Sequence, residues 1–363
     1  MSIKVDEDEF LDMYHFQEGS EAFNAPKGIV FDKDGQVVCH TSVHTYEYSL
    51  EDTPENIDWG SAIILTAEEG TLLRVFYHKK WYVSTHKKLD SYASRWGCKY
   101  SFRTLFNHAI QECLVKEDGE SDEPVDLETE FFDKLDKTKV YTFLLRNNIS
   151  NRIVCESPSS SEPKLYFTGV YQKNIDTTAI PMPSMSGFEI PIISVEQHFL
   201  NSREQAINVV TSMDYHKVQG LLVFTPNQVF KLMCDKYLIV KKVRDNCSNM
   251  LFRYAQLRQT DPEMCNTLVK MFPTYSMDFC QFENNLQKVA YYISVQYLNR
   301  YVRKKYASVT PLQYKITKKL REWYIQDPIN NRITPQVALE FINRENYVYI
   351  YKLVVDFDQM KTQ

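Results

Sequence analysis

Four basic side chains crowd one short stretch near the end of the sequence. They fall within seven residues: Lys315, Lys318, Lys319 and Arg321. Thr310 followed by Pro311 is typical of a helix start, so a helix is predicted from Pro311 to Tyr324. Like charges on one helix repel, and among acidic residues only Glu322 is near in sequence. We interpret the four as contacts to the phosphates of single-stranded or structured RNA, the alternative being an ordinary solvated helix face.

The charge of the whole chain supports an anionic partner for this region alone. The 363 residues include 42 Lys and Arg against 47 Asp and Glu, a net charge of −5. Residues 241–363 hold 19 basic and 11 acidic residues, or +8, which leaves 23 basic and 36 acidic residues, or −13, in residues 1–240. A basic C-terminal third beside an acidic remainder indicates a polyanion at one part of the molecule.

Neither the cysteines nor the histidines have the spacing of a metal site. The eight cysteines are scattered, with no CxxC and no Cys/His pair at zinc-finger spacing, so we expect reduced thiols. The eight histidines all lie at or before His216, and His78, His86 and His108 fit surface or helix positions better than metal ligands. No metal ligand is predicted.

Composition narrows the class of protein. Hydrophobic residues make up 44% and charged residues 25%, with only 10 Gly and 14 Pro, which excludes fibrous and low-complexity proteins. No apolar run approaches 18 residues, and acidic residues occupy the start, where a signal peptide would be basic and then apolar. We expect a soluble cytoplasmic protein without a membrane partner; its oligomeric state is left open.

The apolar spacing changes along the chain and predicts two kinds of structure. Strands are expected near residues 28–31, 37–38, 62–65, 71–77, 81–85, 140–145, 151–155, 164–170, 219–224 and 228–232. Helices are expected at residues 101–115, 195–212, 282–297 and 311–324, and after Pro335. The predicted fold class is α+β, with an acidic N-terminal segment 1–24, an antiparallel-rich domain 25–240 and a smaller, basic all-helical domain 241–363.

Five motifs follow one another through the antiparallel-rich part. They are KGIVFDKDG at 27–35, the segment 62–91 beginning AIILTAEEGTLLRVFY, YTFLLRNNISNRIV at 141–154, QGLLVF at 219–224 and FKLMCDKY at 230–237. In this order they resemble the phage-type RNA ligase 1 family and its relatives in large DNA viruses. The resemblance implies a ligase-type nucleotidyltransferase domain over 25–240 and ATP-dependent RNA ligation with ATP and Mg as cofactors. Host cytoplasm or a viral factory would then be its location.

Several positions that carry the family's chemistry differ in this chain. In that family a lysine attacks the α-phosphate of ATP and becomes a lysyl-adenylate, which alanine cannot form. The nucleophile position falls on Ala67, the third-motif glutamate on Leu144, the fourth-motif glutamate on Gln219 and the second fifth-motif lysine on Met233. An engineered change at Ala67 would not explain the other three, so we favour natural decay and assign no catalytic residue.

Other motif positions keep residue types that suit a nucleotide. By the resemblance, the nucleotide-binding residues are Lys27, Glu69, Gly70, Thr71, Lys87, Gly220 and Lys231. We expect Gly70, Lys87, Gly220 and Lys231 to line a single cleft. Gly70 has the alternative of a turn or bulge glycine, and Lys87 and Lys231 that of solvated surface lysines.

Three functions remain open from the sequence. The favoured hypothesis is an RNA ligase-like pseudoenzyme that has lost ligation and still binds nucleotide and RNA. The second is an active RNA ligase or nucleotidyltransferase in which a displaced lysine replaces the nucleophile, with Lys79 and Lys80 nearest in sequence. The third is a structural or interaction protein with a vestigial cleft.

Overall fold

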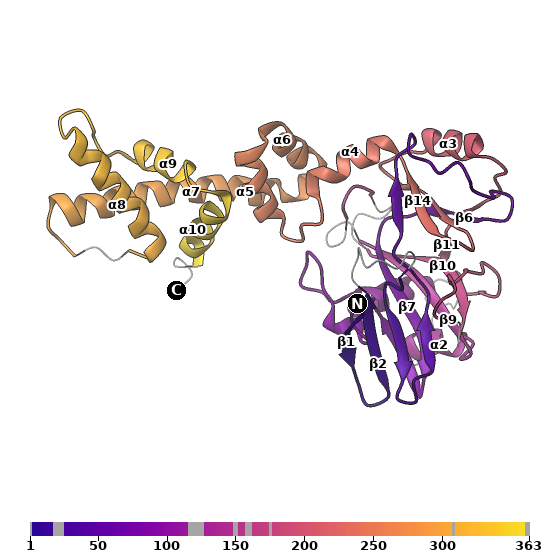
Figure 1. Cartoon of the computed structure of the whole chain (residues 1–363). Helices are drawn as coiled ribbons and strands as arrows, with labels where there is room; N and C mark the ends of the chain where they lie inside the picture. The colour runs from indigo at the N-terminus through magenta and orange to yellow at the C-terminus, as the bar shows by residue number, and fades with distance from the viewer. Residues whose placement is uncertain are drawn as a thin grey trace. The chain divides into compact units, whose positions relative to one another are not determined.

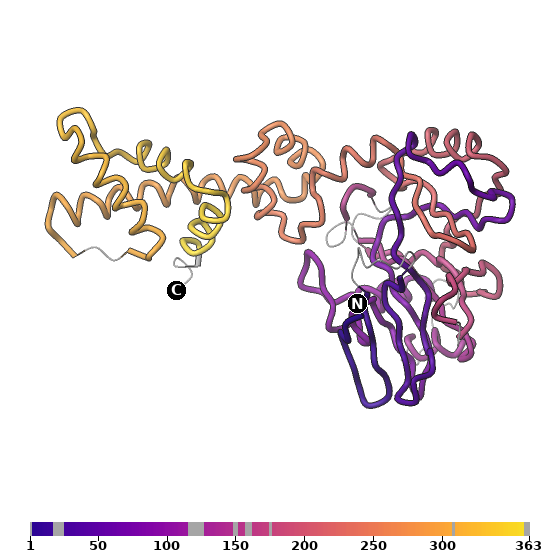
Figure 2. The backbone as a smooth tube through the Cα atoms, viewed as in Figure 1, coloured from indigo at the N-terminus to yellow at the C-terminus, as the bar shows by residue number. Residues whose placement is uncertain are grey.

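The chain folds into two compact units, residues 1–242 and 243–363 (Figure 1). The structure is a computed structural model and describes residues 2–16, 25–114, 127–147, 152–156, 162–173, 176–306 and 309–359. Figure 2 follows the backbone by colour through both units, and α4 (Asp235–Arg244) crosses the division between them. Antiparallel-rich sheets followed by a helical region confirm the predicted α+β class.

The first sheet includes the acidic start of the chain. Its four antiparallel strands, in the order β1-β2-β3-β4, are β1 (Ser2–Glu7), β2 (Leu11–Phe16), β3 (Ile29–Asp32) and β4 (Val37–His40). β3 and β4 correspond to the strands predicted near residues 28–31 and 37–38, and they pair as a hairpin. Its turn closes because the Asp32 carboxylate accepts the backbone N–H groups of Asp34 and Gln36, and Gly35 adopts a positive φ of 81°. Sequence reasoning missed β1 and β2.

The second sheet has the order β11-β10-β9-β7-β8. Its strands are β7 (Thr71–His78), β8 (Lys80–Ser84), β9 (Lys139–Arg146), β10 (Lys164–Gln172) and β11 (Ile193–Ser194). Two helices, α1 (Phe102–Leu114) and α2 (Leu127–Asp133), pack against one face, where Phe106, Phe131 and Phe143 are fully buried. The other face carries Phe76 and Val140, which pack against the first sheet, and Leu144, which packs toward the third sheet.

The third sheet has the order β12-β6-β13-β14-β5. Its strands are β5 (Tyr46–Tyr48), β6 (Ile63–Ala67), β12 (Gln197–His198), β13 (Gly220–Phe224) and β14 (Val229–Met233). β13 and β14 correspond to the strands predicted near residues 219–224 and 228–232, and they pair as a hairpin. The helix predicted from residue 195 begins later, as α3 (Arg203–Ser212), because β12 pairs with β6 and Ser202 caps the helix by accepting the Gln205 N–H.

A buried arginine joins the first and second sheets. Arg74 of β7 is fully buried, and its guanidinium donates to the carbonyl oxygens of Gly28 at 2.7 Å and Thr85 at 2.6 Å and to the Ser84 hydroxyl at 3.2 Å. These acceptors supply the hydrogen bonds that a buried cation requires. Arg74 thereby fixes where the chain enters β3, close to Lys27.

The C-terminal unit is helical. It contains α5 (Met250–Thr260), α6 (Pro262–Met271), a short 3₁₀ turn η2 (Pro273–Tyr275), α7 (Ser276–Tyr297), a π-helical turn η3 (Leu298–Val302), α8 (Pro311–Gln326), α9 (Pro335–Asn343) and α10 (Tyr347–Gln359). The other 3₁₀ turn, η1 (Ser91–Ala93), belongs to the first unit. The helix predicted at 311–324 is confirmed, with a Thr310 cap that exchanges hydrogen bonds with Gln313. No described helix combines the length and apolar character needed to cross a membrane.

Candidate functional site

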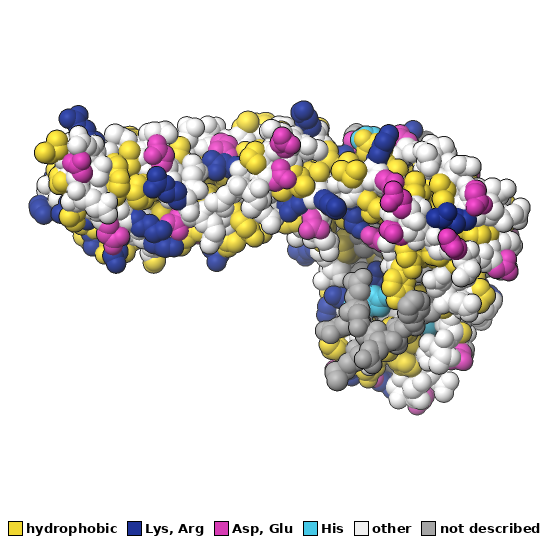
Figure 3. Space-filling model, turned by 45° about the horizontal axis from the view of Figure 1, so that its top comes forward, with side chains coloured by type: hydrophobic (Ala, Val, Ile, Leu, Met, Phe, Trp, Pro, Cys, Tyr) yellow, Lys and Arg dark blue, Asp and Glu magenta, His cyan; other side chains and the backbone are white. Residues whose placement is uncertain are grey.

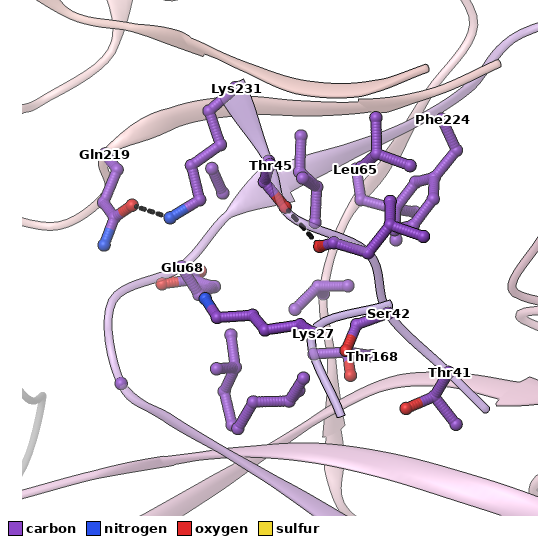
Figure 4. Close-up of a pocket in the computed structure, with 18 of the residues that line it drawn as sticks. Lys27, Thr41, Ser42, Thr45, Leu65, Glu68, Thr168, Gln219, Phe224 and Lys231 are labelled. Atoms are coloured by element: carbon purple, nitrogen blue, oxygen red, sulfur yellow. Dashed lines mark hydrogen bonds between the residues drawn. The ribbon is translucent and has the colours of Figure 1, made fainter. Parts of the chain in front are cut away.

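A pocket of about 250 Å³ opens between the second and third sheets. This volume is slightly below the usual range of about 300 to 1,000 Å³ for small-molecule sites. Leu72 and Leu144 contribute from the second sheet, while Leu65, Phe224 and Val229 contribute from the third. Figure 4 shows Lys27, Lys231, Gln219 and Glu68 gathered at one end of the pocket and Leu65 and Phe224 at the other. An apolar end beside a cationic end suits a ligand with a flat apolar group and an anionic group.

Six of the positions carried over from the ligase family line this pocket. They are Lys27, Ala67, Gly70, Leu144, Gln219 and Lys231. The remaining ones, which are Glu69, Thr71, Lys87, Gly220 and Met233, are absent from its described lining. The structure therefore brings together residues that are more than 200 positions apart in sequence, from Lys27 to Lys231.

Ala67 ends β6 at the pocket wall and is only 2% exposed. Its carbonyl oxygen accepts the Gln219 N–H at 2.8 Å, and β6 and β13 pair it with Gly220. Its methyl group offers no nucleophile. Lys79 and Lys80, the lysines nearest in sequence, belong to the β7–β8 hairpin and are not among the described residues of the pocket wall.

Lys231 supplies an amine close to this point. Its Nζ donates to Gln219 Oε1 at 2.7 Å (Figure 4), and the Gln219 backbone is bonded to Ala67. Burial lowers the pKa of Lys231 from 10.5 to about 8, with nearby Lys27 and Lys241 lowering it further and Glu47 opposing them. Lys231 is therefore a partly desolvated cation that faces the pocket, not the solvated strand lysine of the alternative interpretation.

Glu69 has a structural role in this fold. It is 3% exposed, and its carboxylate accepts the backbone N–H groups of Ile153, Val154 and Cys155 and the hydroxyl of Tyr237 at 2.9 Å. The predicted strand 151–155 is wrong for its described part, since residues 152–155 form no strand and donate to Glu69 instead. Asn151 lies outside the described residues. The Glu69 carboxylate is thus occupied by four protein donors.

Glu68 is the pocket's single carboxylate among the residues that the structure describes there. It pairs with the buried Arg146 guanidinium at 2.5 Å, and burial raises its pKa while Arg146 opposes that shift. Across the described ranges no three His, Cys, Asp or Glu side chains converge on a possible metal position. The described residues do not fit a protein-held Mg²⁺, which prefers carboxylate oxygens.

The two motif glycines are required by close backbone contacts. A Cβ at Gly70 would lie 2.7 Å from the Leu145 carbonyl oxygen, so β7 could not approach β9 as it does. Gly220 has a φ of +148°, and a Cβ there would lie 2.0 Å from the Leu232 oxygen. Gly70 lines the pocket and Gly220 pairs with the fully buried Met233 of β14. Both glycines have a packing reason that is independent of any ligand.

Lys87 and Thr71 lie in an adjoining groove. The groove shares Lys27, Leu72 and His86 with the pocket, and Arg95 and His15 also line it. No Asp or Glu belongs to its described lining. Burial lowers the pKa of His86 well below its usual value, and the nearby cations Arg74 and Lys27 lower it further. The groove extends the cationic end of the pocket.

The basic cluster in the helical unit is more neutralised than the sequence indicates. Glu345, 7% exposed, accepts Lys315 at 3.0 Å and also pairs with Lys319. Lys318 lies 3.9 Å from Glu322 on the same helix. Arg321 instead stacks on aromatic rings. Sequence reasoning considered Glu322 alone, because Glu345 is brought to α8 by the later helices.

Comparison with solved structures finds ATP-dependent ligases. An archaeal ATP-dependent RNA ligase gives a TM-score of 0.44 at 10% identity, covering 77% of this chain and 68% of that chain. A putative ATP-dependent DNA ligase from Aquifex aeolicus gives 0.39 at 12% identity, covering 74% and 66%. A Naegleria gruberi RNA ligase variant with ATP and Mn gives 0.31 at 12% identity, covering 50% and 52%.

Comparison of sequences finds two viral proteins. The chain is 30% identical over 249 residues to an immediate-early protein ICP-46 homolog of Invertebrate iridescent virus 3, covering 67% of this chain and 50% of that protein. It is 28% identical over 279 residues to the ICP-46 homolog of Invertebrate iridescent virus 6, covering 74% and 59%. The chain thus spans between half and three fifths of these relatives' length. No family model matches it.

The role of Glu69 gives a stability prediction. Glu69→Gln should lower the free energy of unfolding by about 2 to 4 kcal/mol, because an amide NH₂ in place of a carboxylate oxygen faces buried donors that then lose their acceptor. Urea unfolding measures the change. The control Glu196→Gln, at a side chain 75% exposed, should stay within about 0.5 kcal/mol. Unchanged stability combined with weaker ATP binding would instead assign Glu69 to the nucleotide.

Proposed function

We propose that this chain is an RNA ligase-like protein that binds a nucleotide in the pocket between the second and third sheets, binds RNA, and does not form a lysyl-adenylate. The observation that carries the proposal is the pocket itself, which gathers six motif positions of the family. Four of them, Lys27, Gly70, Gln219 and Lys231, leave a cationic cradle, whereas Ala67 and Leu144 present only hydrocarbon. The family's residue types for binding persist here without its nucleophile.

The ligand chemistry follows from the two ends of the pocket. Leu65, Phe224 and Val229 offer an apolar surface for a base, and Lys27 and Lys231 offer positive charge for phosphates. The groove with Lys87 and Arg95 continues the positive charge beyond Lys27. A nucleoside triphosphate matches this order of apolar and anionic groups.

RNA is proposed as the partner of the helical unit. Residues 241–363 carry +8 against −13 for residues 1–240. Figure 3 shows Lys and Arg side chains recurring along the visible face of the helical unit. A polyanion approaching such a surface releases counterions, which gives affinity together with a marked dependence on salt.

One observation favours a second candidate, an active nucleotidyltransferase. The Lys231 amine donates a hydrogen bond to the side chain of Gln219, whose backbone N–H donates to the Ala67 oxygen. Because the pKa of Lys231 is about 8, part of this amine is neutral near pH 7 to 8. A neutral amine could attack the α-phosphorus of ATP, forming an N–P bond, breaking the bond to pyrophosphate and giving up a proton to solvent. Lys231 would then replace the missing nucleophile.

The two candidates differ in covalent labelling. We expect no SDS-resistant label when the protein is incubated with α-³²P-labelled ATP and Mg²⁺ and run on a denaturing gel. Ala67→Lys should also stay unlabelled, since one residue does not restore the positions at Leu144 and Gln219. Label on the wild type that disappears in Lys231→Arg would establish the second candidate and refute the loss of adenylylation.

Nucleotide binding should depend on pH through Lys231. With a pKa of about 8, the amine is charged at pH 7 and loses its charge as the pH rises, so attraction to phosphate weakens. The dissociation constant for ATP should be level from pH 6.8 to 7.5 and rise by up to about tenfold per unit above pH 8. Calorimetric titration measures it, in a range where phosphate groups are already ionised.

A guanidinium control isolates this effect. Lys231→Arg keeps its charge throughout this pH range, so its affinity for ATP should stay level to pH 9.5. Lys231→Met should bind weakly at every pH. A wild-type affinity that ignores pH while Lys231→Met still binds as tightly would place the nucleotide elsewhere.

A further inference from the structure

A cluster of positive charge that no described carboxylate pairs with lies at the end of α7, whereas the α8 lysines are paired. Arg300, Arg303, Lys304 and Lys305 have no carboxylate within ion-pair distance among the residues that the structure describes, and all four are exposed. Arg303 does bond to Asn299 at 3.1 Å. By contrast, Lys315 and Lys319 share Glu345. An incoming anion would therefore meet four neighbouring cations at residues 300–305 that no described carboxylate neutralises.

The backbone presents these residues in a fixed turn. After α7 the chain widens into η3, where the Arg303 N–H bonds to the Leu298 oxygen at 2.9 Å. Lys304 then takes a φ of +57°, and the Lys305 N–H bonds to the Asn299 oxygen at 2.9 Å. A helix C-terminus favours nearby cations, which accounts for their position in the sequence. It does not account for what their side chains contact.

Arginine and tyrosine side chains alternate beside this turn. The Arg300 guanidinium lies 4.8 Å from the centre of the Tyr314 ring and 5.8 Å from that of Tyr301. Arg321 lies 5.2 Å from the Tyr301 ring and 5.6 Å from the Tyr324 ring. The series Tyr314, Arg300, Tyr301, Arg321, Tyr324 therefore joins η3 to α8. Tyr314 is 40% exposed, so one ring at the end of the series remains open to solvent.

We propose that this arginine–tyrosine series and the adjacent cations bind an unpaired nucleic-acid strand, with bases stacking on Tyr314 and Arg300 and phosphates contacting residues 303–305. The inference rests on the proposed RNA binding and names the surface that performs it. Flat rings and guanidinium planes stack on bases of any sequence, and the free cations neutralise the backbone between them. A duplex hides its base faces and would lose the stacking part. An acidic polypeptide would engage the cations without needing the Tyr314 ring.

Tyr314 variants separate stacking from charge. The full-length protein is titrated against fluorescein-labelled 12-nucleotide oligo(U) and oligo(dT) strands and a 12-base-pair duplex, with anisotropy as the readout. Tyr314→Ala should weaken strand binding about fivefold to a hundredfold, whereas Tyr314→Phe, which keeps the ring, should bind like the wild type. The wild type should bind the duplex more weakly than the single strands, and the two variants should bind the duplex equally. Tighter oligo(U) than oligo(dT) binding would identify RNA as the strand.

Arginine and lysine variants test the phosphate contacts. Arg303→Ala combined with Lys305→Ala should flatten the dependence of log affinity on log salt by about 1.4, at about 0.7 per phosphate contact. Lys270→Ala, an exposed lysine on α6, is the matched charge control and should leave the slope within about 0.3.

Three outcomes would overturn the inference. The first uses the triple variant Lys315→Gln, Lys319→Gln and Glu345→Gln, in which both lysines and their shared carboxylate become uncharged. If this variant loses affinity while Tyr314→Ala binds like the wild type, the α8 lysines form the RNA-binding surface and the RNA-binding proposal stands. In the second, polyglutamate displaces the labelled strand as well as unlabelled oligo(U) does, which would assign the cations to an acidic protein. If the wild type binds no strand, proposed RNA binding fails as well, whereas ATP binding by the first unit is measured independently.

Discussion

The fold around the pocket depends on one buried carboxylate and one buried guanidinium. Glu69 collects three backbone N–H groups and the Tyr237 hydroxyl, so it ties the segment 153–155 and α4 to the end of β6. Arg146 donates from Nε to the Glu69 carbonyl oxygen at 2.8 Å and from Nη1 to the Lys217 oxygen at 3.1 Å. Because buried charges require hydrogen-bond partners, these contacts hold the segments that meet at the end of β6 in one arrangement.

Residues after Ala67 that match the ligase motif in type have other roles in this structure. An acid, a glycine and a hydroxyl follow Ala67, and the resemblance assigns all three to a nucleotide. In the structure Glu69 is occupied by protein donors, and Gly70 is needed because β7 passes within contact distance of Leu145. Thr71 faces the adjoining groove. The pocket is therefore left with two lysines and one paired carboxylate, which favours binding an anion over assembling a metal-assisted reaction.

The sequence predicted those features whose causes are local. The β3–β4 and β13–β14 hairpins and α8 follow from turn residues, alternation and a cap within a few positions. Contacts across long separations escaped it: Glu69 with residues 153–155, and Glu345 with Lys315 and Lys319. The error at 195–212 has the same origin, since pairing of β12 with the distant β6 overrides helical spacing. Motif order led us to expect Gly70, Lys87, Gly220 and Lys231 in a single cleft; Gly70 and Lys231 line the pocket, while Lys87 lines the adjoining groove and Gly220 is absent from both described linings.

The surroundings of Lys231 agree with the binding role proposed for this pocket. Its pKa falls from 10.5 to about 8 because burial disfavours the charged amine. Gln219 supplies one acceptor, and Glu47 lies near enough to offset part of that effect. Glu68, the single carboxylate of the described lining, is paired with Arg146, so a phosphate bound between Lys231 and Lys27 would add opposite charge there and raise the pKa of Lys231 toward its ordinary value. Binding an anion would offset the cost of burying the Lys231 ammonium group, and this effect requires neither a nucleophile at residue 67 nor a carboxylate at residue 144.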